Sequence, residues 1–257
     1  MFPFHLWVPD VYQGSPTPVT TFMATGTKAA GFAFLLNAAF LLPPSASTTL
    51  AVIALATMAA GNLGALVQTD LKRMLAYSGV AHAGTLLLAA AGYLHGDPKA
   101  IGGAVSAVLY YMAAYVFTAG GAFGIVAWLE RETGGPVTLE SLRGLSTRRP
   151  AVAAALALFM LSLGGIPATG GFLGKYFVFS VAVRAGMIGV AIVAVLLSVV
   201  ALGYYLRVIV ALYMQKATQP VASAPETRLP AALATGVCAL LVLWLGLMPG
   251  WLLAQLG

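Results

Sequence analysis

Two lysines and a histidine of this 257-residue chain lie in otherwise apolar stretches, and all three can hold or release a proton. Lys28 stands eleven residues after Thr17, Lys175 ends a Gly/Pro-rich stretch, and His82 lies between them in the sequence. Burial disfavours an ammonium ion, so a lysine inside a bilayer could lose its charge, and a histidine titrates near neutral pH without help. Joined by hydroxyl groups, such side chains could pass protons. The candidate hydroxyl groups belong to Tyr111, Tyr115 and Ser198.

Each candidate also has a structural interpretation. Lys175 could snorkel from a helix end to the lipid headgroups, but the sequence stays mostly apolar until Arg184, which places the membrane boundary later. Lys28 lies about 16 Å along its helix, near the bilayer midplane, where the competing interpretation is a structural ion pair. No acidic residue of the chain lies in a predicted span to form that pair. Taken alone, His82 is more often a packing residue than a proton carrier. The buried lysines are therefore the leading functional candidates.

The composition predicts a polytopic membrane protein. Hydrophobic residues make up 60% of the chain and charged residues 8%, whereas about a quarter of a soluble domain is charged. A net charge of +6 is best explained by membrane topology in a chain this apolar, so we expect no nucleic-acid binding. The single Cys238 excludes an internal disulfide, and no spacing of His, Cys, Asp and Glu is typical of a metal site.

Hydropathy predicts an all-α bundle of seven membrane-spanning helices. Residues 1–9 are apolar but too short to span, and residues 10–16 are predicted to be a polar connection. Residues 130–149 form the only sizeable hydrophilic loop, and residues 215–228 form a polar linker. The predicted spans cover residues 17–42, 50–67, 75–94, 100–129, 151–183, 187–213 and 230–253.

The fifth span is predicted to be discontinuous. Residues 151–183 are too many for one straight crossing of a bilayer core about 30 Å thick. A proline removes a backbone donor there, and glycines allow the chain to leave helical geometry. At membrane depth a break survives only where protein packs around it or where it lines a wet cavity. The residues assigned to this break are Gly164, Gly165, Pro167, Gly170 and Gly171.

The basic residues outside the spans predict the orientation of the chain. The side that holds the loops at residues 10–16, 68–73, 130–149 and 214–229 is predicted to be cytoplasmic, and the C-terminus to lie outside. That side carries nine basic residues and the other carries two. The nine are Lys72, Arg73, Arg131, Arg143, Arg148, Arg149, Arg207, Lys216 and Arg228, and the two are Lys99 and Arg184.

Three motifs resemble the antiporter-like membrane subunits of respiratory complex I. They read Pro-Phe-His-Leu-Trp-Val-Pro-Asp-Val-Tyr-Gln-Gly from residue 3, Gln-Thr-Asp-Leu-Lys-Arg-Met-Leu-Ala-Tyr-Ser-Gly from residue 68, and Leu-Gly-Gly-Ile-Pro-Ala-Thr-Gly-Gly-Phe-Leu-Gly-Lys from residue 163. The motifs stand in the family's order and make the match specific. Val-Tyr-Gln-Gly from residue 11 is most similar to the branch of the family called subunit N.

The resemblance implies a subunit of fourteen helices with two inverted five-helix repeats, each containing a broken helix. It also implies a line of buried charges that conducts protons. Lys28 matches the central lysine of that line, and Lys175 matches the lysine on the second broken helix. Further motif positions are occupied by His82 and by a charged cytoplasmic turn that contains Asp70, Lys72 and Arg73.

The same comparison divides the chain. Residues 1–42 match the end of the first repeat, residues 43–214 the second repeat with its broken helix at 150–183, and residues 215–257 a linker and the C-terminal helix. Family members carry a glutamate on an earlier helix and a lysine about two residues before Pro-Phe-His, and this sequence begins after both. We therefore expect a fragment or a start assigned too late, and both residues should appear in an upstream reading frame.

The function implied by the resemblance is proton translocation by a membrane subunit of NADH–quinone oxidoreductase in a bacterial inner membrane. No cofactor is expected in this chain, because NAD, flavin, iron–sulfur clusters and quinone belong to partner subunits of such a complex. The expected partners are the other membrane and peripheral subunits and the lipid bilayer. Two alternatives are a subunit of a multi-subunit cation/proton antiporter, which would transport Na⁺ in vesicles, and a purely structural membrane subunit.

The charge distribution predicts that residues 130–149 face the cytoplasm. A cysteine introduced at Ser141 should therefore resist a membrane-impermeant thiol reagent added outside intact cells. Labelling is measured before and after the cells are opened, in a chain whose Cys238 has been replaced. Ready labelling at position 141 in intact cells would overturn this orientation.

Overall fold

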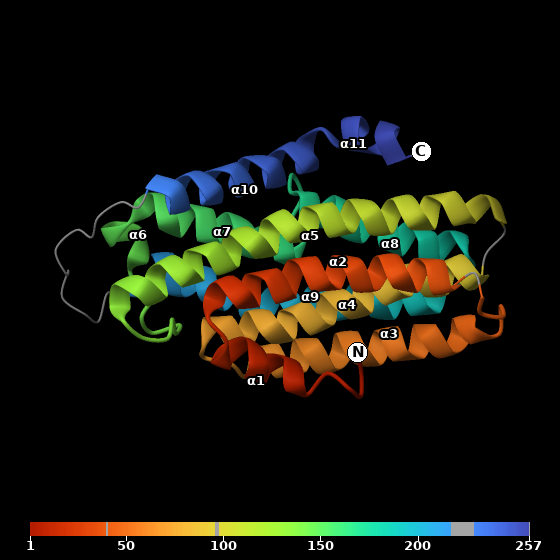
Figure 1. Ribbon diagram of the computed structural model, residues 1–257, viewed down its shortest axis with the longest axis horizontal. Helices are drawn as coiled ribbons and strands as arrows, with labels where there is room; N and C mark the ends of the chain where they lie inside the picture. The colour runs from red at the N-terminus through yellow and green to blue at the C-terminus, as the bar shows by residue number, and fades with distance from the viewer. Residues whose placement is uncertain (40, 96–97, 217–228, 257) are drawn as a thin grey trace.

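The computed structural model describes residues 1–39, 41–95, 98–216 and 229–256. Within these residues the chain is a bundle of helices without a β-strand, as the sequence predicts (Figure 1). One isolated β-bridge joins Asp70 to Thr138. The helices long and apolar enough to cross a membrane are α2 (Thr17–Ala39), α3 (Ala46–Leu66), α4 (Leu71–His95), α5 (Pro98–Thr133), α9 (Ile188–Tyr213) and α10 (Leu229–Leu247).

The predicted discontinuous span is present as two shorter helices. α7 (Pro150–Gly164) and α8 (Gly170–Arg184) follow one another along the long axis of the bundle, and together they run its length (Figure 1). In the described part of the chain, this pair and the six continuous helices make the seven predicted crossings. The remaining helices are α1 (Trp7–Gly14), α6 (Leu145–Arg148) and α11 (Pro249–Leu256).

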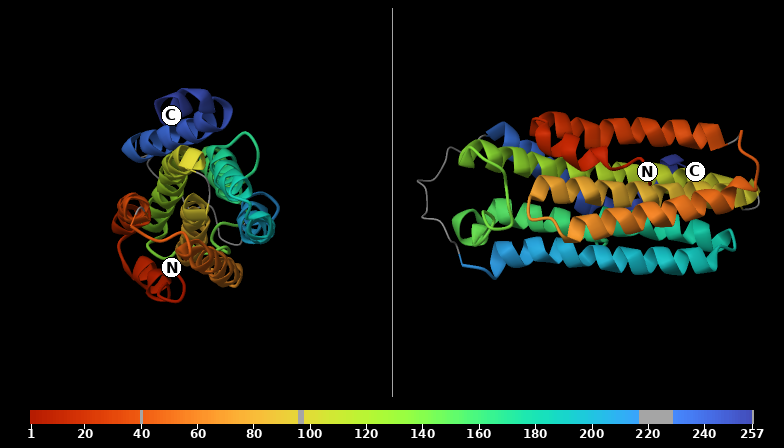
Figure 2. Two further views of the ribbon diagram at one scale, coloured as in Figure 1. Left: turned by 90° about the vertical axis from the view of Figure 1, so that its right-hand side faces the viewer. Right: turned by 90° about the horizontal axis from the view of Figure 1, so that it is seen from below.

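α4 is the central helix of the bundle, with its neighbours arranged around it (Figure 2). In its most apolar stretch 89% of the residues are buried, against 11% in α10. Glycines let α3 approach α4 backbone to backbone: a Cβ added at Gly61 would lie 2.5 Å from the amide nitrogen of Ala81. Because small residues are what bring helix backbones together in membranes, this contact fixes α3 against the centre.

α9 and α10 expose their apolar side chains on the outside of the bundle. Ile192, Leu196 and Val199 of α9 are more than half exposed, as are Leu233 and Leu240 of α10. Rows of this kind suit contact with lipid or with neighbouring membrane subunits.

The loops between helices separate into two sets at opposite ends of the bundle. Residues 67–70, 134–144 and 214–216 lie at one end, and residues 185–187 and the C-terminus lie at the other (Figure 1). This is the division that the charge pattern predicts. Arg228, the side chain of Lys99 and most of the predicted linker lie outside the described residues. Which end faces the cytoplasm stays a prediction.

Several predicted boundaries were wrong. Residues 10–14, predicted to be part of a polar connection, belong to α1, in which Pro9 lies in the first turn. The predicted loop at 130–149 contains the last turn of α5 and the short α6. The last span is two helices, since Pro249 lacks an amide hydrogen and begins α11 instead of continuing α10.

The contact between α3 and α4 gives a test of the packing. Gly61→Ala should lower the free energy of unfolding by about 1–3 kcal/mol, because the new methyl group would overlap the backbone of α4. Gly120→Ala is the matched control, since Gly120 also lies inside a helix but has open space at its Cβ position. Unfolding is followed by circular dichroism in detergent. Equal stability of the two variants would contradict the close approach.

Candidate functional site

The helix break occupies residues 165–169, between the end of α7 and the start of α8. Gly165 has a φ of +85°, a left-handed conformation that glycine adopts without strain. In this turn the amide of Gly165 donates to the carbonyls of Leu161 and Ser162, and the amide of Ile166 donates to Leu161. Two of the carbonyls at the end of α7 are thereby satisfied by backbone groups.

Lys175 satisfies the next two carbonyls. Its buried Nζ donates hydrogen bonds of 2.9 Å to the carbonyl of Leu163 and 3.0 Å to that of Gly164. A cation at a helix C-terminus also complements the negative end of the helix dipole. The lysine on α8 therefore closes the end of α7, and its charge is held by backbone oxygen atoms rather than by a carboxylate.

Glycines place α8 close to its neighbours. A Cβ added at Gly171 would lie 2.0 Å from the carbonyl oxygen of Ser162, and one at Gly174 would lie 2.4 Å from the ring of Tyr111. Gly170 and Gly171, which the sequence analysis assigned to the break, lie in the first turn of α8. Gly171 serves close packing against α7, and Gly165 and Pro167 lie in the break itself.

Lys28 reaches across from α2 to α4 and α5. Its Nζ donates hydrogen bonds of 2.9 Å to the carbonyl of Gly79 and 2.7 Å to the hydroxyl of Tyr115, and it lies 4.2 Å from the centre of the Tyr115 ring. The missing side chain of Gly79 leaves room for the ammonium group, since a Cβ there would lie 3.1 Å from Nζ. In the described ranges no carboxylate pairs with Lys28.

His82 lies buried on α4 and joins residues of two other helices. Its Nδ1 is 2.6 Å from the hydroxyl of Tyr111, and its Nε2 is 3.0 Å from the hydroxyl of Tyr205, which is 2.5 Å from the hydroxyl of Ser78. A neutral imidazole has one N–H, so one tyrosine accepts from the ring and the other donates to it. The ring can therefore accept a proton at one nitrogen and release another from the second nitrogen, between the hydroxyl groups of Tyr111 and Tyr205.

The lysines lie on either side of this polar cluster. The rings of His82 and Tyr115 are 5.2 Å apart between centroids, which joins the Lys28 contacts to those of His82. Toward the break, the Tyr111 ring packs on Gly174, the residue before Lys175. The structure thus brings five predicted residues into one line, from Lys28 through Tyr115, His82 and Tyr111 to Lys175, in which the last step is a packing contact at Gly174.

Ser198 is the predicted candidate that the structure does not bring into this line. It lies half-buried on α9, two turns before Tyr205, and its side chain forms no hydrogen bond with another described residue. The α9 contact is made by Tyr205, which the sequence analysis did not select. Two signals were available: a pair of adjacent tyrosines in an apolar span, and Ser78 one helical turn before His82.

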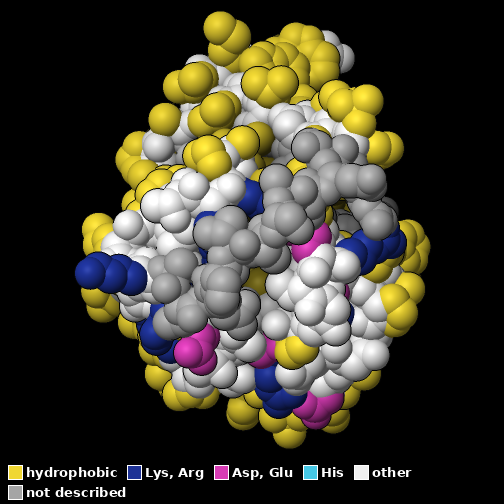
Figure 3. Space-filling view, turned by 90° about the vertical axis from the view of Figure 1, so that its left-hand side faces the viewer, with side chains coloured by type: hydrophobic (Ala, Val, Ile, Leu, Met, Phe, Trp, Pro, Cys, Tyr) yellow, Lys and Arg dark blue, Asp and Glu magenta, His cyan; other side chains and the backbone are white. Residues whose placement is uncertain are grey.

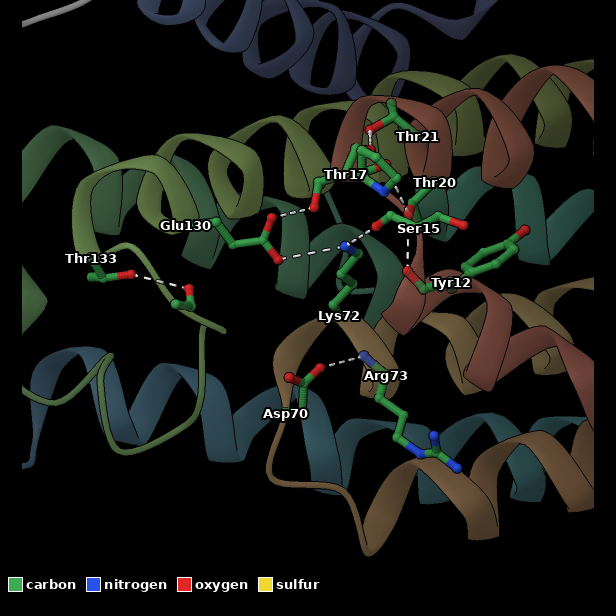
Figure 4. A network of polar contacts seen from close by, with 12 residues as sticks. Tyr12, Ser15, Thr17, Thr20, Thr21, Asp70, Lys72, Arg73, Glu130 and Thr133 are labelled. Carbon is green, nitrogen blue, oxygen red and sulfur yellow. Dashed lines mark hydrogen bonds and ion pairs between the residues drawn. The ribbon is translucent and has the colours of Figure 1, made fainter.

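The charged turn that contains Asp70, Lys72 and Arg73 makes contacts between helices at one end of the bundle (Figure 4). The Asp70 carboxylate accepts the amide hydrogen of Arg73 at 2.8 Å and so caps α4. The buried Lys72 donates to the carbonyl of Ser15 at 2.6 Å and lies 3.6 Å from Glu130. Glu130 in turn accepts from Thr17, at the start of α2. The turn therefore ties the junction of α1 and α2 to α4 and α5.

The sequence matches the family described as NADH:quinone oxidoreductase/Mrp antiporter, TM, over residues 1–201. NADH-quinone oxidoreductase subunit N of Myxococcus xanthus is 43% identical and covers 97% of this chain, which spans 54% of that protein. Subunit N 2 of Roseiflexus castenholzii is 42% identical over 97% of the chain and 50% of its own length. The chain thus spans about half the length of the curated relatives it matches.

Solved structures show the same fold. A chain of respiratory complex I from Thermus thermophilus is 40% identical, with a TM-score of 0.84 over 100% of this chain and 55% of that one. A chain of the Mrp complex from Dietzia sp. has a TM-score of 0.85 at 23% identity, over 99% of this chain and 55% of its own. The second likeness is evidence of the fold alone.

The hydrogen bonds of His82 predict that Tyr205, rather than Ser198, is the α9 residue that stabilises the bundle. Tyr205→Phe should lower the free energy of unfolding by about 1–3 kcal/mol, because it leaves the Nε2 of His82 and the hydroxyl of Ser78 without this partner. Ser198→Ala, on the same helix, should change it by no more than about 0.5 kcal/mol. Thermal unfolding of the two variants in detergent compares them. A larger loss for Ser198→Ala would contradict the observed geometry.

Proposed function

The chain belongs to the NADH:quinone oxidoreductase/Mrp antiporter transmembrane family, and we propose that it conducts protons as part of a membrane subunit of NADH–quinone oxidoreductase. The observation that carries the proposal is the line of polar groups inside an apolar bundle, from Lys28 through Tyr115, His82 and Tyr111 to Lys175. Buried ionisable groups are expensive in a membrane, so a line of them favours a role in ion movement over packing.

The contacts of Lys175 allow it to gain and lose a proton without disturbing the helix break. A charged amine has three N–H groups, of which two bind the carbonyls of Leu163 and Gly164. After loss of the third proton the neutral amine keeps both hydrogen bonds and gains a lone pair. The transferable proton is therefore separate from the two that close the end of α7.

The middle of the line exchanges protons through His82. The ring can accept a proton on the nitrogen that faces Tyr205 and release one from the nitrogen that faces Tyr111, or the reverse. The Tyr115 hydroxyl accepts from Lys28 and can turn its own hydrogen toward another acceptor. Tyr115 and His82 share only a ring contact, and Tyr111 approaches Lys175 only through Gly174, so in this proposal a side-chain rotation or a water molecule completes both steps.

In this proposal the driving reaction lies outside the chain. NAD, flavin, iron–sulfur clusters and quinone would belong to partner subunits, and the chain would contact other membrane and peripheral subunits in a bacterial inner membrane. Its basic end would face the cytoplasm, because positive loops are retained on that side.

Two other functions predict different results in experiments on the same chain. A subunit of a cation/proton antiporter is the alternative that the family description also names, and it would require Na⁺ transport in reconstituted vesicles. A structural subunit would tolerate loss of both buried lysines without loss of pumping. Co-purification with NADH dehydrogenase activity would favour the first proposal over the antiporter.

Substitutions of Lys175 distinguish a role as a proton carrier from a role as a structural cation. Arginine keeps the charge but is effectively unable to release its proton. Lys175→Arg and Lys175→Ala should therefore both depress NADH-driven proton pumping in the assembled complex. Arg184→Ala, which removes an exposed cation from the end of α8, should pump like the parent.

The measurement is proton uptake by vesicles, normalised to the amount of assembled complex. If Lys175 is structural, Lys175→Arg will retain full activity and only Lys175→Ala will fail, through poor assembly. Full activity of the arginine variant would therefore refute the carrier role.

A further inference from the structure

We propose that the chain binds the phosphate headgroup of an anionic phospholipid in a cavity beside α9. The cavity has a volume of about 640 Å³, which is within the range of ligand sites. Its walls include Thr138 and Arg143 of the loop after α5, and Leu206, Arg207 and Val210 of α9. None of the residues that line this α9 cavity belongs to the line of polar groups from Lys28 to Lys175.

The residues that line the α9 cavity belong to the end of the bundle that Figure 3 shows, where basic and acidic side chains both occur and hydrophobic side chains surround the face. Its loop wall is fixed at two points. Thr138 forms a β-bridge with Asp70, and the amide of Gly144 donates to the carbonyl of Ala211 on α9 at 3.1 Å. A cavity held in this way is formed before a ligand arrives, so little ordering is required on binding.

Arg143 carries a positive charge that no described residue compensates. Its side chain forms no hydrogen bond or ion pair with the described residues, and its Nε is buried without a partner. Two other arginines at this end have acidic partners: Arg73 lies 2.6 Å from Asp10, and Arg149 lies 2.7 Å from Glu132. Because Arg143 is half-buried and lines the cavity, an anion bound there would compensate a charge that has no partner among the described residues.

Arg207 supplies a second guanidinium from the opposite wall. One of its N–H groups donates to the carbonyl of Leu66, which anchors the side chain and leaves other donors available. Glu140 also lines the cavity, but it pairs with neither arginine, so two cations face one anion. Guanidinium groups bind phosphate oxygens through paired hydrogen bonds, which makes a phosphate the fitting ligand.

The apolar wall favours a lipid over a free phosphate ion. Leu206 is 45% exposed beside Arg207, and the exposed row of α9 continues along the helix through Val199 and Leu196. A headgroup in the cavity would therefore place its acyl chains along an apolar surface. Basic pockets between membrane helices at the cytoplasmic face are known to suit anionic headgroups for this reason.

The test uses the complex purified in detergent and a photoactivatable phosphatidylglycerol. Cross-links should map to residues 138–143 and 203–211, and unlabelled phosphatidylglycerol should compete, whereas phosphatidylcholine and inorganic phosphate should not. Arg143→Ala and Arg207→Ala should each weaken labelling by about tenfold, the effect of losing one charge-assisted hydrogen bond. Arg131→Ala is the matched control, since it removes an exposed arginine from the same end and should leave labelling unchanged.

Three results would overturn the proposal. Competition by inorganic phosphate would indicate a free-anion site, and an equal effect of Arg131→Ala would indicate attraction to the basic end in general. Absence of lipid cross-links at residues 138–143 and 203–211, with cross-links elsewhere on the chain, would show that the lipid headgroup does not occupy the cavity. If Arg143→Ala fails to assemble, Arg207→Ala decides, because that side chain is exposed and its loss leaves the core intact.

Discussion

A membrane offers no water to an unpaired backbone group, and this constraint governs the arrangement around the helix break. Four carbonyls at the end of α7 need donors, and the turn at Gly165 supplies donors for only two of them. Lys175 must therefore reach back from α8, and it can do so only because glycines bring α8 against its neighbours. The same approach places Tyr111 beside the break. A requirement of backbone chemistry thus sets the positions of Lys175 and Tyr111 beside the break.

α4 organises the other half of the line of polar groups from Lys28 to Lys175. Ser78 and His82 lie one helical turn apart on it, and Gly79 between them leaves the space that Lys28 enters. Because α4 is enclosed by other helices, polar groups on it must find partners from those helices. They find them on α2, α5 and α9, which is why residues far apart in sequence meet at one histidine.

The sequence predicted most of the spans and the position of the break, because hydropathy and Gly/Pro signals are local. Lys28 and Lys175 were also evident, since a charge in an apolar run is conspicuous. Tyr205 was not, because its importance depends on which face of α9 meets His82, and an almost uniformly apolar helix does not reveal that face. The extension of α5 beyond Glu130 was not predicted, for a different reason. Charged residues are typical of a loop, but here Glu130 pairs with Lys72.

Both lysines are held by backbone carbonyls, and no carboxylate in the described part of the chain neutralises either of them. Each amine joins two helices in this way: Lys28 links α2 to α4 at Gly79, and Lys175 links α8 to α7 at Leu163 and Gly164. A backbone carbonyl accepts a hydrogen bond from a neutral amine as well as from an ammonium group. These two connections between helices therefore do not depend on the charge of either lysine.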